Sequence, residues 1–283
     1  MKKGVASHEV FIGSTGVIGR TLPVDRIVKA LPALFDQLST RGGAQAARAI
    51  LTTDLRPKSV VRRARISGRT VTIGGMAKGS GMIHPDMATM LGYLTTDASI
   101  TRTALQRALL EAADASFNCI SVDGDTSTND TVLCLANGMA GNRQIREGTP
   151  PFRRFVALLT EVCEPLALAI CRDGEGVTKV VKIEVTGAAS LGQARAVART
   201  IGTSNLVKTA LFGEDANWGR IMDMTMVDVT DLPPVHVGDT VTLIGRQGQE
   251  AILADEIARW SGTIPYETLC GIGPRILRVY QGS

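Results

Sequence analysis

The stretch Lys78–Leu91, K-G-S-G-M-I-H-P-D-M-A-T-M-L, predicts a glycine turn that leads into a strand. Its glycines allow turn conformations that other residues avoid, and Pro85 stops any helix. The apolar run T-M-L-G-Y-L at residues 89–94 is typical of a strand. Thr89 therefore stands where a loop enters a rigid element, which suits a nucleophilic hydroxyl group. The alternative is an ordinary threonine that opens a strand.

Outward from this stretch, the apolar pattern alternates between the periods of strands and helices. Strands are expected at 10–12, near 59–76, and at 132–136, 179–186 and 206–212. Helices are expected at 24–48, 101–117, 151–171 and 191–202. Such mixing predicts an α/β fold, a layered α+β sandwich of sheets covered by helices.

The pattern changes near residue 221. Residues 222–229 alternate at period two, 241–245 form a second expected strand, and 253–260 a short helix. We therefore expect two domains, at residues 1–220 and 221–283, the second a small strand-rich unit.

Composition narrows the classes of partner. The basic cluster R-R-A-R at residues 62–65 has no interleaved aromatic residues, which argues against nucleic-acid binding. No apolar run reaches the roughly 18 residues of a membrane span, so no membrane partner is expected. The five cysteines form no C-x-x-C pair, which argues against disulfides and a zinc site and favours a cytoplasmic protein. No metal is expected.

The hydroxyl of Thr89 needs a base and an oxyanion hole before it can attack a carbonyl group. Cleavage of the Ala88–Thr89 bond would release an α-amine with a reference pKa of about 7.7–8.0, a suitable base near neutral pH. The turn at Thr15 and Gly16 could supply converging backbone N–H groups. Its alternative is a simple tight turn.

Two acidic segments are candidates for the rest of a site. Glu175, in the turn R-D-G-E-G at residues 172–176, could hold a substrate ammonium or be a solvated turn carboxylate. The segment 123–130 superficially matches a calcium loop. It has Thr128 where that loop needs glycine and Cys134 where it needs glutamate, so we expect a polar loop instead.

Several motifs occur in the order of one known family and together cover about residues 10–221. They are G-S-T-G-V-I-G at 13–19, T-T-D at 52–54, the 78–91 stretch, S-V-D-G-D-T-S-T-N-D-T-V at 121–132, R-D-G-E-G at 172–176, and L-V-K-T-A-L-F-G-E-D-A-N-W-G-R at 206–220. On these motifs the chain resembles the ornithine acetyltransferases, the bifunctional glutamate N-acetyltransferases of arginine biosynthesis.

The resemblance implies self-cleavage between Ala88 and Thr89 into two fragments that stay together as a hetero-oligomer. Thr89 then takes an acetyl group from N-acetylornithine and passes it to glutamate. No cofactor is implied, although some members accept acetyl-CoA as the donor. The residues implied are Thr15 and Gly16 for the oxyanion hole, and Thr52, Lys78, Thr89 and Glu175 for the substrate.

A second resemblance covers the tail. The pieces G-R-I-M-D-M-T-M-V-D-V-T-D-L-P at 219–233, V-G-D-T-V-T-L-I-G at 237–245, G-T-I-P-Y-E-T-L-C at 262–270 and P-R-I-L-R-V-Y at 274–280 resemble the C-terminal part of alanine racemase. Tyr266 would contact pyridoxal phosphate only if the chain were racemase-like, and the matched pieces do not include the cofactor lysine. We therefore expect no racemase activity and no bound cofactor.

Three hypotheses follow. Members of the acetyltransferase family begin about a hundred residues before the position of Met1, so the resemblance implies an N-terminally shortened domain. The chain is then an acetyltransferase, an inactive truncated fusion protein, or a fragment of a pyridoxal-phosphate racemase. The motifs favour the acetyltransferase.

Overall fold

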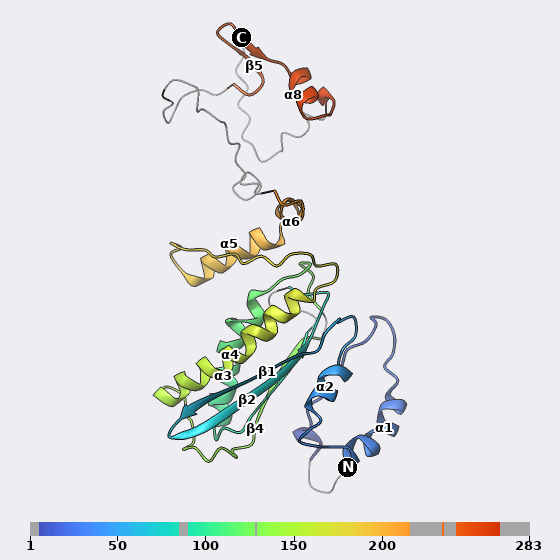
Figure 1. Cartoon of the computed structure of the whole chain (residues 1–283), viewed down its shortest axis with the longest axis vertical. Coiled ribbons are helices and arrows are strands. Elements are labelled where there is room, and N and C mark those ends of the chain that lie inside the picture. Colours follow the sequence, from blue (N-terminus) through green and yellow to red (C-terminus); the bar gives the residue numbers. More distant parts are fainter. Residues whose placement is uncertain (1–5, 85–89, 128, 216–233, 235–241, 267–283) are drawn as a thin grey trace. The chain divides into compact units, whose positions relative to one another are not determined.

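The computed structural model describes residues 6–84, 90–127, 129–215, 234 and 242–266. Its backbone contacts divide the chain into two compact units, Met1–Met224 and Thr225–Ser283. The larger unit contains the sheet and the long helices (Figure 1).

A four-stranded sheet forms the centre of the first unit. Its order is β1-β2-β3-β4, made of β1 (Lys58–Ile66), β2 (Arg69–Lys78), β3 (Leu91–Thr96) and β4 (Thr131–Ala136). The first three strands are antiparallel, whereas β3 and β4 are parallel. Ser67 and Gly68 join β1 to β2 with φ angles of 49° and 78°, the left-handed backbone that a two-residue hairpin turn requires.

The parallel pair needs a long connection, which contains α3 (Arg102–Asp114). Alanines at 104, 108 and 112 form its buried stripe, and α4 (Pro150–Arg172) packs beside it over the same sheet (Figure 1). Gly75 permits this close packing, because a Cβ there would lie 2.5 Å from Leu94 and 3.0 Å from both Leu166 and Val162. Burial of these aliphatic side chains is the main stabilising term of the unit.

The remaining elements are more exposed. The segment before the sheet holds a short 3-10 helix, η1 (Ser7–Glu9), α1 (Val24–Asp36) and α2 (Gly43–Ala49). After α4 come α5 (Leu191–Thr203) and α6 (Asn205–Phe212). The second unit contains β5 (Gly245–Gln247), β6 (Glu250–Ile252) and α8 (Ala254–Trp260).

The mixed α/β class is confirmed, and so are the helices expected at 101–117, 151–171 and 253–260. The strand expected at 206–212 is wrong, because this segment is the helix α6. Its buried residues Val207 and Ala210 are three positions apart, a helical spacing, and Ser204 caps the helix by accepting a hydrogen bond from the Val207 amide.

Three further expectations fail in the first unit. Residues 10–12 and 179–186 are irregular rather than strands. The helix expected at 24–48 is two helices, because residues 37–42 interrupt it. The strand expected at 222–229 lies outside the described residues.

Candidate active site

The sheet register brings three chain segments together at one end of the sheet. Lys78, the last residue of β2, pairs with Leu91, the first of β3, and Leu91 pairs with Thr131, the first of β4. The segments that leave or enter these strands therefore meet at the same edge. Ala88 and Thr89 enter β3 from this edge in sequence, but they lie outside the described residues.

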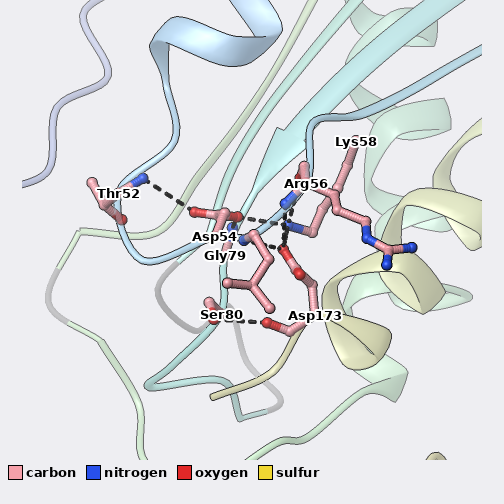
Figure 2. A network of polar contacts seen from close by, with 8 residues as sticks. Thr52, Asp54, Arg56, Lys58, Gly79, Ser80 and Asp173 are labelled. Carbon is pink, nitrogen blue, oxygen red and sulfur yellow. Dashed lines mark hydrogen bonds and ion pairs between the residues drawn. The ribbon is translucent and has the colours of Figure 1, made fainter. Parts of the chain in front are cut away.

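A buried ion-pair network organises this edge (Figure 2). The Lys58 ammonium lies 2.7 Å from Asp54 Oδ1 and 2.5 Å from Asp173 Oδ2, and all three side chains are nearly inaccessible to solvent. Asp54 Oδ1 also accepts a hydrogen bond from the Gly79 amide at 2.7 Å, and its Oδ2 accepts one from the Thr52 amide at 3.3 Å. One carboxylate thus ties the 52–54 segment to the residue after Lys78.

Asp173 extends the network to the acidic turn. Its Oδ2 accepts hydrogen bonds from the Leu55 and Arg56 amides, and its carbonyl oxygen accepts one from the Ser80 hydroxyl at 2.7 Å. The Glu175 amide donates to the Ser80 carbonyl at 2.8 Å. Glu175 itself is exposed.

The Glu175 carboxyl group lies against the glycine turn. A Cβ on Gly81 would lie 2.9 Å from its carboxyl carbon, so only a glycine fits here without a shift. Three residues that the sequence singled out thus lie at this network: the Thr52 and Glu175 amides bond to it, and Lys78 interacts electrostatically with Asp54, Lys58 and Glu175.

Burial and the neighbouring polar groups act in opposite directions on the pKa of Asp54 and, in part, on that of Lys78. Burial by itself raises the pKa of Asp54, but hydrogen bonds from Lys58 and Gly79 outweigh it, and the pKa lies below its ordinary value. Burial lowers the pKa of Lys78, and the positive charge of Lys58 lowers it further. The negative charges of Asp54, Asp130 and Glu175 oppose this change, but the pKa of Lys78 stays below its ordinary value. Lys78 is therefore a buried amine surrounded by carboxylates.

The polar loop expected at 123–130 packs on the glycine turn. Asp123 accepts hydrogen bonds from the amides of Met82, at 2.6 Å, and Ile83, at 2.9 Å. Its oxygens are thus used to hold the turn. Among the described residues, no group of three or more His, Cys, Asp or Glu side chains is arranged to hold a metal ion.

Asp130, at the end of this loop, is a residue that sequence reasoning did not single out. Its Oδ1 accepts a hydrogen bond from the Met90 amide at 2.8 Å. Its Oδ2 is buried and has no hydrogen-bond partner within the described part of the chain. Burial raises the pKa of Asp130 to about 6, although the Met90 amide and the charge of Lys78 partly oppose this. The only local signal was a polar residue directly before a strand.

The turn proposed for the oxyanion hole lies next to this edge. The Tyr93 hydroxyl of β3 donates to the Gly13 carbonyl at 3.4 Å, and the Asn129 side chain donates to the Ser14 carbonyl. Thr15 is half-buried and Gly16 is exposed. The Asn129 side chain thus anchors this turn next to Asp130.

Tyr266 lies in the second unit, where 79% of its surface is exposed. The described helices include none that is long and apolar enough to cross a bilayer.

A mixed α/β unit with buried acidic and basic groups at the end of its sheet is typical of an enzyme. The ArgJ family model matches residues 1–250, and the chain belongs to this family. It is similar to the arginine biosynthesis bifunctional protein ArgJ of Symbiobacterium thermophilum, with 56% identity over 219 residues, 77% of this chain and 54% of that protein. The ArgJ protein of Geobacillus kaustophilus is 45% identical over 250 residues, 87% of this chain and 61% of that protein.

Among solved structures, the chain is similar to the ArgJ protein of Bacillus halodurans. The identity is 50% and the TM-score 0.45, over 46% of this chain and 62% of that one. The chain spans about half the length of the first curated relatives that it matches.

The comparisons do not support the expected racemase-like tail. The family match continues past residue 221 to residue 250, and one relative aligns over 262 residues, 89% of this chain. About half of the tail thus falls within the acetyltransferase family's own match.

Proposed function

We propose that the protein is a glutamate N-acetyltransferase and ornithine acetyltransferase of arginine biosynthesis. It cleaves itself between Ala88 and Thr89, and the Thr89 hydroxyl attacks the acetyl group of N-acetylornithine. Ornithine leaves, and the glutamate amine takes the acetyl group from the threonine ester. Backbone N–H groups at Thr15 and Gly16 stabilise the oxyanion of each tetrahedral intermediate.

The observation that carries this proposal is the grouping of Thr52, Lys78 and Glu175 around the Lys58 network in a member of the ArgJ family. The exposed carboxylate of Glu175 suits an amino-acid ammonium group. A Lys78 ammonium suits an amino-acid carboxylate. Lys78 pairs with Leu91, the first residue of β3, and Thr89 stands two residues before Leu91 in the sequence.

The donor, the partners and the location belong to the same proposal. The reaction needs no cofactor, and acetyl-CoA is an alternative acetyl donor. The two fragments made by cleavage remain associated, and the enzyme works in the cytoplasm. A racemase role is not proposed.

Intact-mass measurement of the purified protein tests the cleavage step. We expect two fragments, of which the second begins at Thr89, and a single uncut chain for Thr89→Ala. Transfer of acetyl from N-acetylornithine to glutamate should disappear in that variant. Thr95→Ala, which changes an exposed threonine of β3, is the matched control and should cleave and transfer normally. An uncut wild-type chain would contradict the proposal.

A further inference from the structure

The Glu175 carboxyl group rests directly on a glycine. A Cβ on Gly81 would lie 2.9 Å from the carboxyl carbon and 3.0 and 3.1 Å from the two carboxyl oxygens. Such separations are shorter than the packing of carbon and oxygen atoms allows. Any side chain at position 81 would therefore push this carboxyl group away from its present place.

The backbone of Gly81 does not itself require glycine. Its φ angle lies outside the positive range that other residues avoid, unlike that of Gly176, whose φ is 69°. The three atoms nearest to the missing Cβ all belong to the Glu175 carboxyl group, and none is a backbone atom. The feature that calls for a glycine here is therefore the neighbouring carboxyl group, and not the conformation of the turn.

The backbone of Glu175 is held from the same side. The Ser80 hydroxyl donates to the Asp173 carbonyl at 2.7 Å (Figure 2), and the Ser80 carbonyl accepts from the Glu175 amide at 2.8 Å. Ser80 is buried, so little water competes for these bonds. Between them, Gly174 packs closely on Val122, because a Cβ there would lie 2.9 Å from Val122 Cγ1. With its backbone fixed, Glu175 can relieve a clash only by turning its side chain.

A displaced carboxylate would lose a ligand that needs it at one place. Glu175 is exposed, so its carboxylate is open to a bound molecule. N-acetylornithine carries one free ammonium group, at the end of its side chain, because its α-amine bears the acetyl group. A hydrogen bond between an ammonium and a carboxylate spans about 2.7–2.9 Å, and a shift of about one ångström is enough to break it.

We propose that Gly81 is a positioning residue of the acetyl transfer. Because it has no side chain, it seats the Glu175 carboxylate where this group binds the free ammonium of N-acetylornithine. This inference rests on the proposed function, in which Glu175 holds a substrate ammonium, and it adds the residue that sets the affinity for the donor. Gly81 takes no part in the bonds that form and break, and it acts through Glu175.

The first measurement is the steady-state transfer of acetyl from N-acetylornithine to saturating glutamate. Gly81→Ala should raise the KM for N-acetylornithine by about 10–100-fold and leave kcat within about threefold, because it removes a binding contact to a charged group. Gly74→Ala is the matched control on β2. Its new Cβ would lie 3.7 Å from Val61 and 3.8 Å from Thr95, which are ordinary contact distances, so both constants should match wild type.

A double-mutant cycle then separates positioning from a general disturbance of the turn. Glu175→Asp shortens the side chain by one methylene group and draws its carboxyl group back from position 81. This change alone should raise the KM for N-acetylornithine. Adding Gly81→Ala in that background should raise it by no more than about threefold further, because the clash is gone. Equal rises in the two backgrounds would overturn the inference, and so would an unchanged KM in Gly81→Ala alone.

The remaining outcomes also decide. If wild type transfers no acetyl group, the proposed function fails and the inference fails with it. If wild type is active but Gly81→Ala does not fold, thermal unfolding of the double variant decides. Glu175→Asp should restore folding when the carboxyl group is the obstacle. A double variant that stays unfolded would show that Gly81 serves the fold instead.

Discussion

Two kinds of buried carboxylate share the same end of the sheet. Asp54 and Asp173 are paired with the Lys58 ammonium, and their remaining interactions go to backbone amides. Asp130 holds one backbone amide and leaves an oxygen free of partners among the described residues. The pKa of Asp54 lies below its ordinary value, whereas the pKa of Asp130 rises to about 6.

The difference separates a structural role from a chemical one. A carboxylate that is fully paired stays ionised and holds its neighbours in place. A carboxyl group that is buried without enough partners destabilises the fold when ionised, and it changes protonation where enzymes work. The Lys58 network thus holds the edge together, whereas Asp130 changes its protonation near pH 6.

The largest expected effect comes from removing the shared cation. Lys58→Met leaves two buried carboxylates without their counter-ion, so we expect a loss of about 3–5 kcal/mol in the free energy of unfolding. Denaturant titration measures it. Lys182→Met, which breaks an exposed pair with Glu184, is the control and should unfold like wild type. A loss below about 1 kcal/mol would show that the network does not hold the edge.

Acid should weaken the same network by a smaller amount. The pKa of Asp54 is lowered in the folded state, so its stabilisation is present above its ordinary value of 3.8 and is lost as the pH falls through the folded pKa. We expect the free energy of unfolding of wild type to decrease below about pH 4. Asp54→Asn should show a shallower decrease when both are followed by denaturant titration across this range. If the free energy of unfolding of both proteins fell equally steeply with pH, Asp54 would not be the source of the acid sensitivity.

The contribution of Asp130 to the free energy of unfolding should change with pH in the opposite direction. Its folded pKa is raised above 3.8, so its contribution is complete at low pH and declines as the pH rises towards about 6. Asp130→Asn removes the buried charge, and we expect it to stabilise the protein by on the order of 1 kcal/mol at about pH 8, after allowing for screening by solvent. At about pH 4 the gain should vanish. Thermal unfolding of both proteins at the two pH values measures this, and a loss of stability at the higher pH would break the comparison.

The smallest effect belongs to an exposed pair away from the edge. The Arg107 Nε and Glu111 Oε1 atoms, one turn apart on α3, lie 2.7 Å apart, and both side chains are partly open to solvent. Glu111→Gln should change the free energy of unfolding by about 0.3 kcal/mol, and added salt should erase the difference. A change as large as that of Lys58→Met would mean that burial is not what distinguishes the network.

The long periodic elements could be predicted from the sequence. The helices α3 and α4 begin at the N-cap residues Thr101 and Thr149, and each has an apolar stripe. Both signals lie within the helix's own stretch of sequence. The strand prediction for α6 failed because its short apolar run fits either period, and its packing through Val207 and Ala210 decides the outcome.

The site was predictable only where a motif carried it. The resemblance supplied Thr52, Lys78 and Glu175, which lie at the Lys58 network, while their roles with a substrate stay predictions. Lys58 and Asp173 were missed because they are 115 residues apart, and an ion pair over that separation leaves no local pattern. Asp130 was passed over as part of a polar loop, since the sequence does not show which carboxyl oxygen lacks a partner.

The parallel pairing of β3 with β4 has a kinetic consequence. The β1–β2 hairpin closes through a two-residue turn and can form in about 1–10 μs. The β3–β4 pair must first close the long connection through α3, which makes it a later event in folding. Met90 and Asp130 therefore meet only when the sheet is complete. If cleavage beside Thr89 depends on that meeting, a newly made chain remains intact until it has folded, and the cut records the end of folding.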